Sequence, residues 1–470
     1  MLLPRFVLPY AAVLAASFTL PCLAADGDPD AGFGTGGVGY VTVDDVSARE
    51  ITPHASIELP DGKLLFAGAR NRIVPPSPWY EPQIRGMLLR LDADGSADAS
   101  FGNTTVPGLV ELPDLAAGQR MQGIESIARF ADGSYVAVGT AMVNGPLAGY
   151  VVKLTASGDV DENFGSGGTV LLPMHYLHVV RLDSQQRIVV GGERFDSGTF
   201  VYTSTVVRLD ASGAYDSTFG SGGTQSITWA DAGASGYVHD LAVVAGDAIV
   251  VGGGFESNGA GLGTDYALAR LDADGRFDTA FATVGWRVFR DETETSIVNA
   301  VERLAPLGDG RIAFAGYHNT GENITGLVLG RVLADGSTDT TFGDLANPGY
   351  FKPAILPSAE SANVSGFVQQ ADGKLVASVA YYTPEKEDFF AVRSTADGAL
   401  DTEFASAGIY DADLAADGVY SEIGTLLLQG DGKLVTAGRA QRTMDSPLVD
   451  FAATRLLVGA LDAVFADGFD

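Results

Sequence analysis

The chain has 470 residues, of which 46% are hydrophobic and 19% are charged, so a sizeable core can be buried and disorder is not expected. Its formal net charge is −30. A surface this acidic disfavours nucleic acid and anionic membrane surfaces as partners. Length alone would predict about three domains, but internal repeats overturn that estimate.

The N-terminal segment has the features of a secretory signal peptide. Arg5 precedes an apolar run over residues 6–20, and Ala24 precedes the expected cleavage point. Residues 1–24 are therefore predicted to be a signal peptide, too short for a membrane span. Cys22 would be removed with it, so the mature chain should contain no thiol. The mature protein, with a formal charge of 28 minus 59, or −31, is expected to be secreted, periplasmic or on the cell surface.

One motif, built around a phenylalanine, recurs along the rest of the chain. It reads RLDASGAYDSTFGSGG from Arg208 and RLDADGRFDTAFA from Arg270. Eight copies of the phenylalanine, 55 to 68 residues apart, enclose seven units: Phe33, Phe101, Phe164, Phe219, Phe281, Phe342, Phe404 and Phe465.

Each unit predicts four short strands. A glycine-rich turn follows the phenylalanine, and then come a short apolar run and a longer extended run that ends in a tight turn. A third strand, such as KLLFAG from Lys63, and a fourth, such as GMLLRL from Gly86, complete the unit. Asp-Gly supplies the positive φ angles that a two-residue hairpin requires. Five of the seven turns have this sequence: Asp61-Gly62, Asp132-Gly133, Asp309-Gly310, Asp372-Gly373 and Asp431-Gly432.

Seven such units could form a propeller, a β-solenoid or a string of small domains. Continuous apolar runs such as residues 327–329 indicate sheets that are covered on both faces. A lone unit of about 60 residues would bury too little surface. We therefore predict an all-β fold, a single seven-bladed β-propeller of four-stranded antiparallel blades over residues 25–470. Only five residues follow Phe465, so the strand at residues 38–43 should complete the last blade and close the ring.

The repeated LDxDGxxDxxFGxxG, alternating with DGKLxxAG, resembles the delta-60 repeat family of bacterial β-propellers over essentially all of residues 26–470. The resemblance implies an exported bacterial propeller and brings no catalytic residues to carry over. The third unit departs from the pattern, with Gln185-Gln186 in place of Asp-Gly, and the last copy lacks the glycine directly after Phe465.

A basic residue closes the fourth strand of every unit, and an aspartate precedes every phenylalanine. We expect charge-assisted pairs that tie each connection to its blade, with the aspartate also accepting backbone N–H bonds. A functional ring of cations is the alternative. The basic residues are Arg90, Lys153, Arg208, Arg270, Arg331, Arg393 and Arg455.

The D-x-D-G-x-x-D sequence of Asp92, Asp94 and Asp98 raises the question of calcium. Its glycine is fourth, whereas the helical calcium loop has glycine sixth and an acid twelfth. Turn stabilisation is the favoured interpretation and calcium the alternative.

Four polar residues share one predicted position at the start of the second strand: His54, Glu125, His178 and His239. Units six and seven have Ser365 and Gly424 there, and the fifth unit is ambiguous. Imidazole and carboxylate groups suit zinc or a similar transition metal, so these four are candidate metal ligands. The alternative is a set of exposed polar residues at strand ends.

The loops between strands one and two, and between strands three and four, should share one face and vary between units. Trp79 and Tyr80 lie in such a loop and are candidate binding residues, suited to a sugar or a protein surface. The sequence shows no G-x-S-x-G or H-E-x-x-H signature and no phosphate-binding loop. We therefore predict a monomeric binding module for a protein or glycan ligand. The alternative is a metal-dependent hydrolase, lactonase or dehydrogenase with its site at the channel mouth.

Overall fold

The structure, a computed structural model, describes residues 25–34, 36–45, 48–72, 83–102, 105–115, 120–142, 147–229, 233–256, 264–289, 299–319, 325–354, 361–382, 387–412, 421–441 and 449–458. The predicted signal peptide, the candidate binding residues Trp79 and Tyr80, and the last phenylalanine, Phe465, lie outside the described residues.

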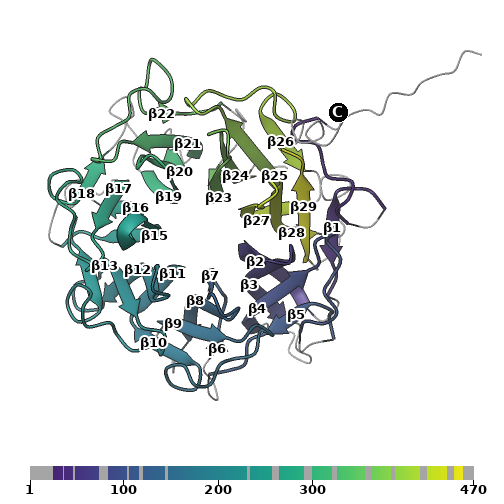
Figure 1. Ribbon diagram of the computed structural model, residues 1–470, viewed down its shortest axis with the longest axis horizontal. Helices are drawn as coiled ribbons and strands as arrows, with labels where there is room; N and C mark the ends of the chain where they lie inside the picture. Colours follow the sequence, from purple (N-terminus) through teal and green to yellow (C-terminus); the bar gives the residue numbers. More distant parts are fainter. Residues whose placement is uncertain are drawn as a thin grey trace, which may run out of the picture.

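The described strands form antiparallel blades arranged in a ring around a central axis (Figure 1). From the axis outwards, the first blade contains β2 (Ala48–Glu58), β3 (Leu64–Arg72), β4 (Gln83–Leu91) and β5 (Leu109–Glu111). The second contains β6 (Arg120–Met121) with β7 (Ser126–Arg129), then β8 (Tyr135–Met142), β9 (Leu147–Leu154) and β10 (Thr169–Pro173). The third contains β11 (His175–Leu182), β12 (Ile188–Asp196), β13 (Val201–Leu209) and β14 (Thr224–Ile227).

The next three blades contain β15 (Gly236–Val244), β16 (Ala248–Glu256), β17 (Thr264–Leu271) and β18 (Trp286–Phe289); β19 (Asn299–Pro306), β20 (Ile312–Asn319), β21 (Thr325–Val332) and β22 (Tyr350–Phe351); and β23 (Ser361–Gln369), β24 (Leu375–Tyr382), β25 (Glu387–Ser394) and β26 (Ile409–Ala412). The seventh contains β27 (Ser421–Leu428), β28 (Leu434–Gln441), β29 (Val449–Leu456) and β1 (Tyr40–Val43). Within the described ranges, the single helical element is a 3₁₀ turn, η1 (Ala245–Asp247).

The two ends of the chain close the ring, as predicted. Strand β1 pairs antiparallel with β29, and Tyr40 lies opposite Thr454. The N-terminal strand therefore supplies the outermost strand of the last blade. A parallel bridge between Glu50 on β2 and Val449 on β29 also joins the first and seventh blades into one sheet.

The predicted hairpin turns form as the sequence requires. Gly62 and Gly133 have φ values of 80° and 91°, in the left-handed region that glycine adopts without strain. In the third blade Gln186 takes this role with φ of 61°, although it carries a side chain. The departure from Asp-Gly therefore changes the residue but not the turn.

The repeated phenylalanine links each blade to the next. Phe33, Phe219 and Phe281 are fully buried, and each ring lies beneath the glycine of the following LDxDG turn. A Cβ atom on Gly275 would come within 2.7 Å of the Phe219 ring. The motif therefore combines a large ring with a residue that has no side chain, which lets neighbouring blades pack closely.

The predicted pairs between the basic residue and the aspartate are confirmed in all seven blades. Nε of Arg208 donates to Asp216 over 2.9 Å, and its Nη1 donates to the Ala273 carbonyl in the next blade. The guanidinium group also lies 4.5 Å from the centre of the Phe219 ring. The pairs are Arg90–Asp98, Lys153–Asp161, Arg208–Asp216, Arg270–Asp278, Arg331–Asp339, Arg393–Asp401 and Arg455–Asp30. They are structural links rather than a functional ring of cations.

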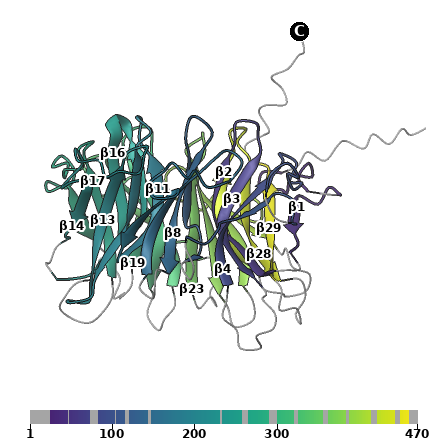
Figure 2. The same cartoon turned by 90° about the horizontal axis from the view of Figure 1, so that it is seen from below.

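Seen from the side, the strands run between two faces of a short cylinder (Figure 2). One face carries the hairpin turns and the repeated connections. The other face carries the start of each innermost strand. No helix among the described residues is long and apolar enough to cross a membrane.

Candidate functional site

The innermost strand of most blades contains a β-bulge at one equivalent position. In β2 the pairing with β3 shifts between Pro53 and Ala55, so that His54 is the extra residue. The same shift makes His178 the extra residue in β11 and His239 the extra residue in β15. A bulge re-aims the side chain that it carries, and here that side chain reaches the ring axis.

A glycine in the second strand lies against the bulge in most blades, whereas Val379 stands opposite Val364 in the sixth. Gly68 lies opposite Pro53, and a Cβ atom at Gly68 would come within 2.0 Å of the Thr52 carbonyl oxygen. Gly192 stands in the same relation to the Tyr176 carbonyl, at 1.9 Å. The "AG" and "GG" of the repeat therefore leave room for the backbone of the bulge.

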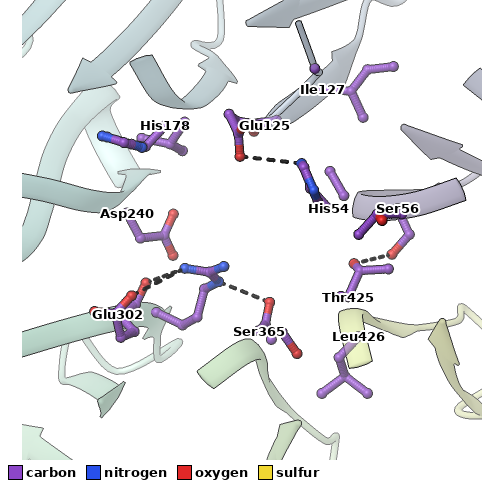
Figure 3. A pocket seen from close by; sticks show the side chains of 18 of the residues that line it. His54, Ser56, Glu125, Ile127, His178, Asp240, Glu302, Ser365, Thr425 and Leu426 are labelled. Carbon is purple, nitrogen blue, oxygen red and sulfur yellow. Dashed lines mark hydrogen bonds and ion pairs between the residues drawn. The ribbon is translucent and has the colours of Figure 1, made fainter. Parts of the chain in front are cut away.

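The bulge residues of six blades, with Glu125 at the equivalent position of the second blade, line one central cavity of about 1200 Å³ (Figure 3). Five of the seven carry a histidine or glutamate. In blade order the residues are His54, Glu125, His178, His239, Glu302, Ser365 and Gly424. The sequence-based alignment of the first four residues is confirmed, and the position in the fifth blade that the sequence left ambiguous belongs to Glu302.

His54 and Glu125 come from adjacent blades and point toward each other (Figure 3). Nδ1 of His54 lies 3.4 Å from Oε2 of Glu125, with the side chains 30% and 39% exposed. Burial acts to lower the pKa of His54, but the Glu125 carboxylate prevails and raises it above 6.5. Burial acts to raise the pKa of Glu125, but His54 prevails and lowers it. The two shifts have the directions expected of an ion pair, since each group favours the charged form of the other.

Two further histidines are paired with glutamates. Nδ1 of His239 lies 2.7 Å from Oε1 of Glu302 in the next blade. Nε2 of His178 lies 2.9 Å from Oε1 of Glu193, which is buried on β12. Burial acts to lower the pKa of His178, but the bond to Glu193 prevails and raises it. The rings of His178 and His239 lie 6.5 Å apart. His54 lies on the other side of Glu125 from His178 (Figure 3).

Arginines balance the acids of the cavity wall. Nε of Arg303 donates to the Ser365 carbonyl over 3.0 Å, and its Nη1 lies 4.0 Å from Oε2 of Glu302. Nη2 of Arg181 donates to Asp240 over 2.9 Å, and Asp240 also accepts the backbone N–H of Leu304. These contacts join the innermost strands of neighbouring blades around the cavity.

The predicted metal site is not assembled in this arrangement. The four candidate ligands share the cavity, but each histidine is paired with a carboxylate, and the described part of the chain holds no group of three or more His, Cys, Asp or Glu residues placed to bind one ion. The aspartates of the repeated turn act locally. Oδ1 of Asp94, for example, accepts the Ser96 N–H over 2.9 Å. Zinc and calcium binding both stay predictions.

The sequence analysis missed Glu302, Glu193 and the arginines of the cavity. Glu302 could have been found by counting from the glycine of the second strand, because Gly316 follows Glu302 by fourteen positions, as Gly68 follows His54. Glu193 has no comparable signal, since its role depends on a contact between β11 and β12.

Five segments match the family described as "Domain of unknown function (DUF5122) beta-propeller": residues 59–101, 131–164, 248–281, 307–342 and 370–404. The chain is therefore a β-propeller repeat protein. The search of curated proteins gave no match.

Among solved structures, the chain is similar to the NanB sialidase of Streptococcus pneumoniae, with 10% identity, a TM-score of 0.41 and coverage of 89% of this chain and 70% of the sialidase. A glucose dehydrogenase has 12% identity, a TM-score of 0.39 and coverage of 70% and 96%. The β-propeller domain of the Trilobed protease from Pyrococcus furiosus has 9% identity, a TM-score of 0.41 and coverage of 90% and 99%. At these values the similarities describe the fold alone.

The comparison corrects the predicted function. The sequence analysis favoured a binding module for a protein or glycan, whereas the matched sialidase and dehydrogenase are propeller enzymes. The predicted binding module is therefore not carried forward, and its alternative, a propeller enzyme, is taken up as a proposal. Since no reaction can be carried over at such low similarity, the chemistry must be argued from the cavity itself.

Proposed function

We propose that this protein is a propeller hydrolase whose active site is the central cavity, with paired histidines as general acid and base. The observation that carries the proposal is the set of three imidazoles, each with a carboxylate partner, that line one cavity of about 1200 Å³. Paired titratable groups with perturbed pKa values in a cavity are typical of catalytic sites.

The pairs divide into a proton donor and a proton acceptor. His54 is the proposed acid, because the carboxylate of Glu125 raises its pKa and so favours the protonated imidazole. His239 is the proposed base. Glu302, whose Oε1 lies 2.7 Å from its Nδ1, would stabilise the imidazolium that forms when Nε2 accepts a proton. His178, paired with Glu193, would keep the cavity wall polar without taking part in the proton transfer.

The proposed reaction is a hydrolysis in which water attacks an electrophilic carbon of the substrate. As the oxygen of a water molecule bonds to the electrophilic carbon of the substrate, His239 takes one proton from that water. The bond from this carbon to the leaving oxygen breaks, and His54 donates its proton to the leaving oxygen. Solvent then restores both imidazoles to their starting states.

Two further points belong to the proposal. The N-terminal sequence supports export, with the enzyme acting outside the cytoplasm as a monomer. The repeated sequence motif supports membership of the delta-60 family within the broader class of propeller repeats.

The test is a hydrolysis screen of the mature protein on chromogenic glycosides, esters and lactones. Removing a general base costs about 100-fold or more in rate, so His239→Gln should lose the activity by that factor. His175→Gln is the matched control, because His175 lies on β11 like His178 but does not line the cavity. Equal activity in the two variants, or no hydrolysis of any of these substrates by the wild type, would refute the proposal.

A further inference from the structure

A strip of aromatic side chains runs from the turn between β12 and β13 of the third blade to β15, the innermost strand of the fourth blade. We call Phe200, Phe195, Tyr202 and Tyr237 the aromatic strip. Their successive ring centres lie 6.2, 4.9 and 5.6 Å apart, and the Tyr237 ring lies 6.4 Å from that of His239. The strip therefore ends at the proposed catalytic base.

The outer end of the strip is held in a costly conformation. Phe200 is 76% exposed and has φ of 59°, a region that bulky residues rarely occupy. The loop is nevertheless ordered, since Asp196 accepts the N–H of Gly198 over 2.8 Å and its carbonyl accepts the N–H of Phe200 over 2.7 Å. A large ring held in solvent against its backbone preference points to a ligand.

The inner rings combine apolar faces with polar edges. Phe195 and Tyr202 lie opposite each other at the ends of β12 and β13, and both are half-buried. Tyr237 belongs to the next blade, and its hydroxyl donates to Glu256 over 2.9 Å. The strip thus crosses from one blade to the next and offers carboxylate and hydroxyl groups beside ring faces.

We propose that the aromatic strip binds a neutral saccharide and directs it into the cavity, so that the bond broken there is a glycosidic bond. Saccharide rings have apolar faces that pack on aromatic side chains and hydroxyl edges that hydrogen-bond to carboxylates. The net charge of −30 disfavours anionic substrates. This inference rests on the proposed hydrolase, whose substrate class it names.

The experiment measures binding rather than turnover. Isothermal titration of the mature protein with neutral hexasaccharides of glucose, xylose and mannose identifies a binder, and choline serves as a cationic probe. The double variant Phe200→Ala/Tyr202→Ala should weaken saccharide binding by about tenfold or more. Tyr215→Ala is the control, because Tyr215 is a tyrosine 47% exposed in the repeated connection between β13 and β14.

His239→Gln separates this inference from the proposed function. Saccharide binding that His239→Gln retains and the double variant loses supports the strip, even if no glycoside is hydrolysed. Binding of choline alone, binding of no saccharide, or equal binding by the double variant and Tyr215→Ala overturns it.

Discussion

Replacing Arg331 with methionine tests the buried links between blades. Arg331 is 5% exposed, and its Nε donates to Asp339 over 2.7 Å, while its Nη1 donates to the Ala396 carbonyl of the next blade over 2.6 Å. Burial acts to raise the pKa of Asp339, but hydrogen bonds from Thr341 and Arg331 prevail and lower it from 3.8 to about 2. The two states of the carboxyl thus differ by about 2 kcal/mol in their interactions.

Removing one partner of a buried pair costs about 3 to 5 kcal/mol. Asp339 keeps some of its partners in the variant, because Thr341 still donates to it and Nη1 of Arg311 lies 3.2 Å away. We therefore expect Arg331→Met to lower the free energy of unfolding by about 3 kcal/mol at pH 7, near the bottom of that range.

Urea denaturation of the mature protein measures the effect, with Arg276→Met as the matched control. Arg276 pairs with Asp274, but the two side chains are 71% and 55% exposed, so the loss should stay below about 1 kcal/mol. The contribution of Asp339 is present above pH 3.8 and is lost as the pH falls through about 2, so the difference from wild type should shrink in acid. Equal midpoints for the two variants would refute the reasoning.

Two other predictions concern the bulge and the ion pair. Gly192→Ala places a Cβ atom 1.9 Å from the Tyr176 carbonyl oxygen and should lower the free energy of unfolding, measured by heat or urea, by about 1 to 3 kcal/mol. Gly308→Ala is the control and should cost far less, because the space around Gly308 is open. Equal losses of stability in the two variants would contradict the crowding argument. His54→Gln removes the ion pair with Glu125. The pair stabilises the fold fully between pH 4.5 and 6.5. Its contribution declines as the pH rises through the raised pKa of His54 or falls through the lowered pKa of Glu125. The variant should therefore lose up to about 1 kcal/mol in that window and less at pH 9, and a loss independent of pH would contradict the pairing.

The fold followed from the sequence because its signals are local and repeated. The Asp-Gly turns, the glycine-rich turns and the buried phenylalanine each fix geometry within one unit or between neighbours, and seven copies reinforce one interpretation. Closure by β1 followed from the position of Phe465 near the end of the chain. The pairs such as Arg208–Asp216 followed from charges written eight residues apart.

The site was only partly predictable. Counting from the Asp-Gly turn aligned His54 with its counterparts, but it failed in the fifth unit, where the turn region is longer and Glu302 was missed. The sequence could not show that His54 meets Glu125 from the next blade, because that contact depends on the radius of the ring and on the bulge. It also could not show that His178 pairs with Glu193 on a neighbouring strand rather than with a metal ion.

The pH dependence of kcat/KM for wild type and Glu125→Gln tests the proposed acid–base site most directly. In the wild type the activity should fall on the alkaline side with a midpoint above 6.5, as the raised pKa of His54 requires. Glu125→Gln removes the carboxylate that raises this pKa, so the alkaline midpoint should move to lower pH. An alkaline limb at the same pH in both proteins would contradict the account.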